Sequence, residues 1–85
     1  MTEGAKRPIS YRKLLTNLRK FGVDELKGRG KGSHRIWARW HHGHLRKTPV
    51  PYHRSKQLGT PMVESIRRKL GLTEADGVSG ADVYR

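Results

Sequence analysis

The sequence predicts an α+β domain in which a three-stranded antiparallel sheet is backed by two helices. Two segments, one near each end of the chain, carry apolar residues at helical spacing next to helix-capping residues. Three short strand-like segments lie between them. A length of 85 residues allows one small domain. For elements in the order helix–strand–strand–strand–helix, one antiparallel sheet backed by both helices is the simplest arrangement that covers both apolar stripes.

The first predicted helix follows Ser10, a residue type that favours the N-cap position. Its apolar residues recur at a spacing of three or four, and cations fill the other face. Gly22 is expected to end it, because glycine readily adopts the left-handed conformation found after helices. The apolar residues are Leu14, Leu15, Leu18 and Phe21.

Three segments between the helices are predicted to be strands. Residues 23–27 give the weakest signal. Residues 33–40, with the sequence SHRIWARW, are rich in aromatic and β-branched residues. Their odd spacing places Trp37 and Trp40 on opposite faces, so one is expected in the core and the other is available to stack on a base. Either tryptophan fits either role at this point, because Ile36 and Trp37 compete for the buried side.

The third strand is predicted over residues 46–52. Pro49 and Pro51 cannot donate backbone hydrogen bonds, which restricts this strand to an edge or to pairing on one side. The short connection HHGHL places Gly43 in a turn and makes the last two strands a hairpin.

The second helix is predicted over residues 60–70. Thr60 is expected to cap it, and Pro61 to take the first helical position. Gly71 and Leu72 are expected to form a glycine stop with a hydrophobic contact. Its apolar residues are Met62, Val63, Ile66 and Leu70.

Apolar residues are concentrated between residues 9 and 72. We therefore expect a folded domain over 9–72, a flexible N-terminal arm over 1–8 and a loose C-terminal tail over 73–85. The tail is acidic, whereas the rest of the chain is strongly basic.

The charge of the chain indicates a polyanionic partner. Nineteen Lys and Arg against seven Asp and Glu give a net charge of +12, and there is no cysteine. Disulfides and thiolate zinc sites are thereby excluded. The sequence has neither an apolar run long enough to span a bilayer nor a secretory leader, so we expect a cytoplasmic protein without a membrane partner.

Residues 27–35 form the densest basic feature, in which glycines alternate with cations before a histidine. Glycines let backbone N–H groups approach a phosphate, and the cations would hold its oxygens. A solvated basic turn is the alternative. The segment lacks the spacing of a nucleotide-binding P-loop. The candidate phosphate-binding residues are Lys27, Arg29, Lys31, Gly32, Ser33 and Arg35.

His34 is the candidate catalytic residue. An imidazole amid cations can take a proton from a ribose 2′-hydroxyl or give one to a leaving oxygen. The alternative is a half-exposed strand histidine without a role. Ser33 lacks a neighbouring acid, which favours hydrogen bonding over nucleophilic attack. His53 precedes further cations and is a candidate for the same anionic site.

Three histidines surround Gly43, but no cysteine or carboxylate accompanies them. Zinc sites need three or four ligands held by second-shell partners. A polar hairpin turn is therefore the favoured interpretation, and neither a metal nor any other cofactor is expected. The three are His41, His42 and His44.

Several motifs together resemble the HicA toxin family, the RNA-cleaving half of bacterial or phage toxin–antitoxin pairs. The resemblance covers about residues 9–72. It rests on Ser10 before a Lys- and Leu-rich helix, on KGSHRIW, on TPVPYH and on TPMVESIRRKLGL. It implies a helix–three strands–helix fold similar to double-stranded-RNA-binding domains.

The resemblance also implies a function. It makes His34 the catalytic residue, with Gly32 and Ser33 in the same segment, of a metal-independent endoribonuclease that cleaves single-stranded mRNA. It implies a HicB-type antitoxin as the partner that covers the active face. Two rivals remain: a non-catalytic nucleic-acid-binding module, which explains the charge and fold equally well, and a basic interaction protein for an acidic partner.

Overall fold

The computed structural model describes residues 5–27, 34–52 and 56–85. None of the helices among these residues combines the length and the apolar character that a membrane span requires. The elements in chain order are β1 (Ile9–Ser10), α1 (Tyr11–Arg19), β2 (Asp24–Glu25), β3 (His34–His41), β4 (His44–Pro51), β5 (Gln57–Leu58), α2 (Thr60–Leu70), a 3-10 turn (Glu74–Asp76) and α3 (Gly80–Tyr84).

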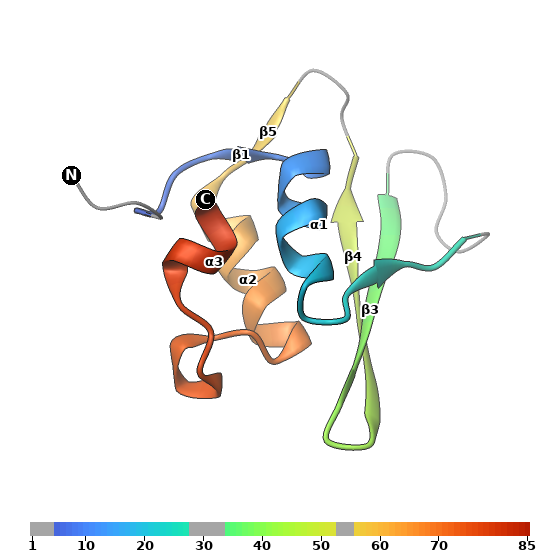
Figure 1. The fold of residues 1–85 in the computed structure, drawn as a ribbon. Helices are drawn as coiled ribbons and strands as arrows, with labels where there is room; N and C mark the ends of the chain where they lie inside the picture. Colours follow the sequence, from blue (N-terminus) through green and yellow to red (C-terminus); the bar gives the residue numbers. More distant parts are fainter. Residues whose placement is uncertain (1–4, 28–33, 53–55) are drawn as a thin grey trace.

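The predicted α+β fold is confirmed. Strands β2, β3 and β4 form a three-stranded antiparallel sheet in that order. The helices gather on one side of this sheet (Figure 1). Strand β4 lies at the edge, as its prolines require. A second, two-stranded sheet that the sequence did not predict pairs β1 with β5.

The β3–β4 hairpin closes through a two-residue turn. His41 pairs with His44 across it, so His42 and Gly43 form the turn itself. Both have positive φ, 51° and 80°. This combination defines a type I′ turn, whose twist matches that of the strands it joins. The predicted hairpin with Gly43 in its turn is confirmed.

Both predicted helices are present, with one difference in capping. The Ser10 side chain accepts a hydrogen bond from the backbone of Lys13 and caps α1. The cap of α2 is Gly59 instead of the predicted Thr60, because the Gly59 carbonyl accepts the first helical hydrogen bond, from Val63. The prediction was therefore one residue late.

The predicted stop after α2 is confirmed. Gly71 has a φ of +72°, and the Leu72 amide donates back to the Arg67 carbonyl while its side chain is fully buried. The Gly71 backbone also lies against the His41 ring, so that a Cβ built there would approach the ring to 2.8 Å. Only glycine fits both the conformation and the space.

The burial of Trp37 shows which face of β3 packs against the helices. Its side chain is fully buried, whereas Trp40 is 70% exposed. Trp37 therefore belongs to the core and Trp40 to the surface, which resolves the choice that the sequence left open. The main core residues around Trp37 are Tyr11, Leu14, Leu18, Val50, Val63, Ile66 and Leu70.

The expectation of a loose C-terminal tail is wrong. Val83 and Tyr84 of α3 are fully buried, and α3 packs against α1. The Asn17 side chain donates to the Val83 carbonyl, and the Arg7 guanidinium donates to the Tyr84 carbonyl. Only a few apolar residues mark this segment, and its acidic composition hid them. The Arg7 contact also shows that the predicted arm over 1–8 is attached at least at this residue.

A buried arginine ties the C-terminal segment to α2. The Arg67 side chain is fully buried and donates to the carbonyls of Leu72 and Val78. It also forms ion pairs with Glu64 and Glu74. A buried guanidinium is stable only when its donors find acceptors, and here Glu64 of α2 and the chain beyond the helix supply them.

We expect Tyr84→Ala to lower the free energy of unfolding by about 3–5 kcal/mol, because it removes a fully buried ring. It also removes the hydrogen bond from the Tyr84 hydroxyl to Glu64. Urea denaturation measures the change. The matched control is Arg85→Ala, which deletes an exposed side chain and should cost less than about 1 kcal/mol. Equal stability of the two variants would mean that the C-terminal segment is loose after all.

Candidate functional site

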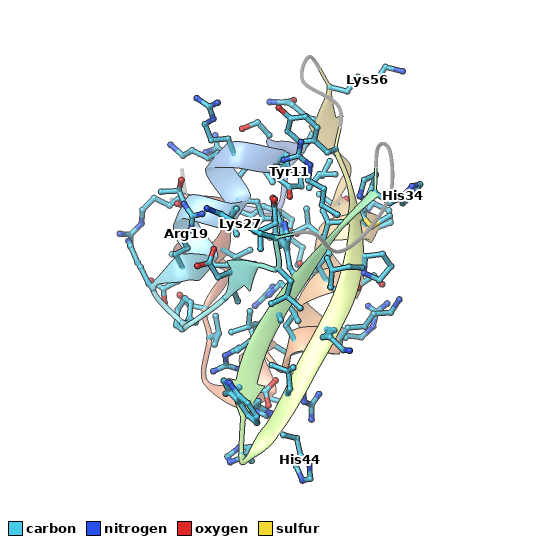
Figure 2. All side chains as sticks on the ribbon, turned by 90° about the vertical axis from the view of Figure 1, so that its right-hand side faces the viewer. Tyr11, Arg19, Lys27, His34, His44 and Lys56 are labelled. Atoms are coloured by element: carbon cyan, nitrogen blue, oxygen red, sulfur yellow. The ribbon has the colours of Figure 1, made fainter. Side chains whose placement is uncertain are left out.

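His34 begins β3 and its side chain is exposed. It pairs with Pro51, the last residue of β4. The site therefore lies at the end of the hairpin away from its turn, and Figure 2 shows His34 and His44 at opposite ends of the sheet. Side chains alternate along a strand, so His34 lies on the face opposite to that of buried Trp37. The imidazole is thus open to a large ligand.

A cluster of five side chains lies beneath the start of β3, on the helix side of the sheet. We call it the Tyr11 cluster. The Trp37 indole donates to the Tyr11 hydroxyl over 2.7 Å, and this hydroxyl donates to Glu25. The rings of Trp37 and Tyr52 both meet the Tyr11 ring edge-on, at 4.9 and 4.8 Å between centroids. The members of the Tyr11 cluster are Tyr11, Glu25, Arg35, Trp37 and Tyr52.

The Tyr11 cluster joins the first residue of α1 to β2, to β3 and to the residue after β4. The Trp37 indole donates to Tyr11 and the Tyr11 hydroxyl donates to Glu25, so each of these donors has the partner that low-dielectric surroundings require. Burial and the hydrogen bond to Glu25 raise the pKa of Tyr11 to about 12. The tyrosine is therefore a neutral donor at any physiological pH. The cluster fixes the backbone from which His34 projects.

Arg35 follows His34 but points to the other face. Its guanidinium lies 3.5 Å from a Glu25 carboxylate oxygen and 4.1 Å from the centre of the Tyr52 ring. The side chain is still 41% exposed. Because a guanidinium has five N–H donors, these contacts leave donors for a phosphate that reaches the end of the strand.

Lys27 is exposed at the end of the β2 segment. The preceding Leu26 amide donates to the Ile36 carbonyl over 2.8 Å, which extends the pairing of β2 with β3 toward His34. Lys27 is thereby brought to the same end of the sheet. The other sequence-predicted phosphate-binding residues lie outside the described residues: Arg29, Lys31, Gly32, Ser33 and His53.

The three histidines around the hairpin turn differ in their surroundings. Within the described parts of the chain, no group of three or more His, Cys, Asp or Glu side chains is arranged to hold a metal. His41 and His42 are neighbours, with ring centroids 4.1 Å apart. His41 packs on Gly71, whereas His42 and His44 are exposed.

Sequence reasoning missed most of the Tyr11 cluster. In the sequence Tyr11 reads as an ordinary residue of the first helix, and Glu25 belongs to the weakest strand prediction. The available signal was the pair Asp24 and Glu25 at the border of a basic region, since no carboxylate occurs from residue 26 to residue 63. Lys56 was also passed over as a site residue, and Figure 2 places it at the same end of the molecule as His34.

We expect the stabilising effect of the Tyr11 hydroxyl to disappear at high pH. An unfolded tyrosine ionises near pH 10, whereas Tyr11 in the fold has a pKa of about 12. The difference in unfolding free energy between wild type and Tyr11→Phe should be constant below pH 10 and shrink as the pH rises from 10 through 12. Urea denaturation at pH 8, 9, 10 and 11 measures it. Tyr84, whose pKa is also raised, is common to both proteins and cancels. A gap that stays unchanged up to pH 11 would contradict the prediction.

Comparison with known proteins gives one family. A family model described as the HicA toxin of bacterial toxin–antitoxin systems matches residues 11–72. Neither the curated proteins nor the solved structures contain a significant match. The matched range runs from the tyrosine that anchors the cluster to the leucine that closes α2, so it includes every element of the main sheet and both long helices. The chain therefore belongs to the HicA toxin family and is the toxin of a toxin–antitoxin system.

Proposed function

We propose that this toxin is a metal-independent endoribonuclease that cleaves single-stranded mRNA, with His34 as its general acid and base. Membership of the HicA family supports nuclease activity in general. The observation that carries the proposal is the exposed imidazole at the start of β3, on a backbone held by the Tyr11 cluster. A reacting group needs this combination of access and fixed position.

The chemistry needs one proton carrier. Neutral His34 takes the proton of a ribose 2′-hydroxyl while the 2′-oxygen attacks the adjacent phosphorus. The O2′–P bond forms, the P–O5′ bond breaks, and the imidazolium returns the proton to the departing 5′-oxygen. The products are a 2′,3′-cyclic phosphate and a 5′-hydroxyl. An unpaired strand suits this reaction, because the 2′-hydroxyl and phosphate can rotate into line.

Cations around His34 would stabilise the negative charge that develops on the phosphate. We propose Lys27 and Arg35 among the described residues. From their position in the sequence we also propose a second group: Arg29, Lys31, Gly32, Ser33 and His53. Glycine in this segment would let backbone N–H groups approach the phosphate oxygens.

We expect His34→Ala to reduce the rate of RNA cleavage by a factor of about 100 to 10,000, the usual contribution of general acid–base catalysis. Cleavage of a labelled, unstructured RNA by purified protein measures it. His44→Ala is the matched control, because His44 is exposed on the same hairpin at its other end. Cleavage that falls equally in both variants would defeat the assignment.

The same assay separates the mechanism from its rivals. Wild-type cleavage should persist in EDTA, should leave 2′,3′-cyclic phosphate ends, and should stop on a 2′-O-methyl substrate. Loss of activity on chelation would instead indicate a metal-dependent reaction. A wild-type protein that retards RNA on a gel and leaves it intact would identify a non-catalytic binding module.

The partner implied by the family is a HicB-type antitoxin. We propose that it covers the face that carries His34. The toxin should then lose RNA cleavage in a co-purified complex, while His34→Ala should still form that complex, since it removes only one exposed ring. Size-exclusion chromatography and the cleavage assay measure both. An antitoxin complex that retains full cleavage activity would contradict the proposed covering of the site.

A further inference from the structure

Trp40 and Leu45 form an apolar patch near the turn of the hairpin. The two residues are direct cross-strand partners in β3 and β4. They are 70% and 43% exposed, and with Met62 they are the exposed large apolar side chains found among the described residues. Directly opposed side chains on a sheet lie about 5 Å apart, so the pair forms one continuous surface. Nothing in the core requires this indole, because Trp37 already fills the interior.

The patch lies on the same face of the sheet as His34. Residues 34, 36, 38 and 40 of β3 share one face, as do their partners 51, 49, 47 and 45 of β4. The helices pack against the other face (Figure 1), and Figure 2 shows the hairpin in front of them. Six residues separate His34 from Trp40, which corresponds to about 20 Å along the strand. An extended nucleic-acid strand along this face would therefore meet both side chains.

The charge around the patch favours a polyanionic occupant. From residue 26 to residue 63 the sequence contains nine Lys and Arg and no Asp or Glu. Lys47 is exposed on the same face, beside the Trp40–Leu45 pair in β4. An aromatic ring beside cations is the combination that binds unpaired bases: the ring stacks on the base, and the cations hold the flanking phosphates.

We propose that Trp40 is a stacking platform for an unpaired base of the RNA substrate, several nucleotides away from the linkage held at His34. Leu45 supports the ring from the neighbouring strand, and Lys47 contacts the backbone phosphate of the same strand of RNA. This proposal rests on RNA being the substrate. It makes the open face of the sheet the path of the RNA strand and gives the toxin a binding subsite remote from the reacting bond.

The test measures RNA affinity separately from cleavage. All proteins compared carry His34→Ala, so that the RNA stays intact. Each is titrated against a fluorescent, unstructured RNA of about fifteen nucleotides. Adding Trp40→Ala should weaken binding between about fivefold and about 150-fold, the range for loss of one stacked base. Trp40→Phe keeps a ring and should lose less. Met62→Ala is the matched control, since Met62 is an exposed apolar residue of α2.

Two further measurements distinguish stacking from charge. Trp40→Ala should leave the slope of log affinity against log salt unchanged, whereas Lys47→Ala should reduce it by about 0.7, the value for one phosphate contact on a single strand. Wild-type binding should also weaken for an RNA that carries abasic sites away from the scissile position. The same abasic RNA should bind Trp40→Ala no more weakly than intact RNA does.

The results separate this proposal from the proposed function. Unchanged RNA affinity of Trp40→Ala overturns the stacking platform even if the toxin cleaves RNA through His34. Weakened RNA affinity of Trp40→Ala supports the platform even if the wild-type protein binds RNA without cleaving it. A Trp40→Ala variant that loses antitoxin binding or changes its self-association, with RNA affinity intact, assigns the patch to a protein partner and overturns the proposal.

Discussion

Burial of Trp37 decides which way every side chain of β3 points. Its ring fills the centre of the core, and its indole N–H requires an acceptor there, which the Tyr11 hydroxyl supplies. Because side chains alternate along a strand, this one placement turns His34 and Trp40 to the open face. A register shift of one residue would bury the proposed catalytic imidazole and expose the core tryptophan. Such a shift is costly, because it would expose the largest fully buried side chain of the core to water.

The same constraint explains how a small domain holds the proposed catalytic imidazole in place at the end of a strand. Tyr11 reaches from the start of α1, Glu25 from β2 and Tyr52 from the end of β4, and all meet beside Trp37 and Arg35. Two of these contacts are aromatic, one is a cation–π contact, and the others are hydrogen bonds or an ion pair, so the cluster links α1 to all three strands of the sheet. Positioning is thus achieved from the buried face, while the open face stays free for a ligand. The helix-facing side of the sheet stabilises the fold, and the opposite side carries the exposed His34 side chain.

The C-terminal segment completes the core from the other side of the helices. Tyr84 donates to Glu64, and Arg67 binds both that carboxylate and the carbonyls of the chain beyond α2. Burial raises the pKa of Glu64, but the hydrogen bonds from Tyr84 and Arg67 outweigh it and the pKa is lowered. The carboxylate therefore stays ionised and paired with the buried guanidinium. This arrangement lies away from the sheet's open face, so its role is to hold α2 and α3 together.

The sequence by itself determined the order of the elements, the hairpin with its glycine turn, both long helices and the membership of a toxin family. These depend on local signals: apolar spacing, capping residues, prolines and short motifs. Only the tertiary structure decided which tryptophan is buried, because alternation alone assigns opposite faces without saying which one meets the helices. It also decided that Val78, Val83 and Tyr84 belong to the core, since so few apolar side chains are buried only where the rest of the fold offers a surface to pack against. The Tyr11 cluster, finally, brings together residues from α1, β2, β3 and the chain just after β4, and no local pattern encodes a contact that forms only when those segments pack.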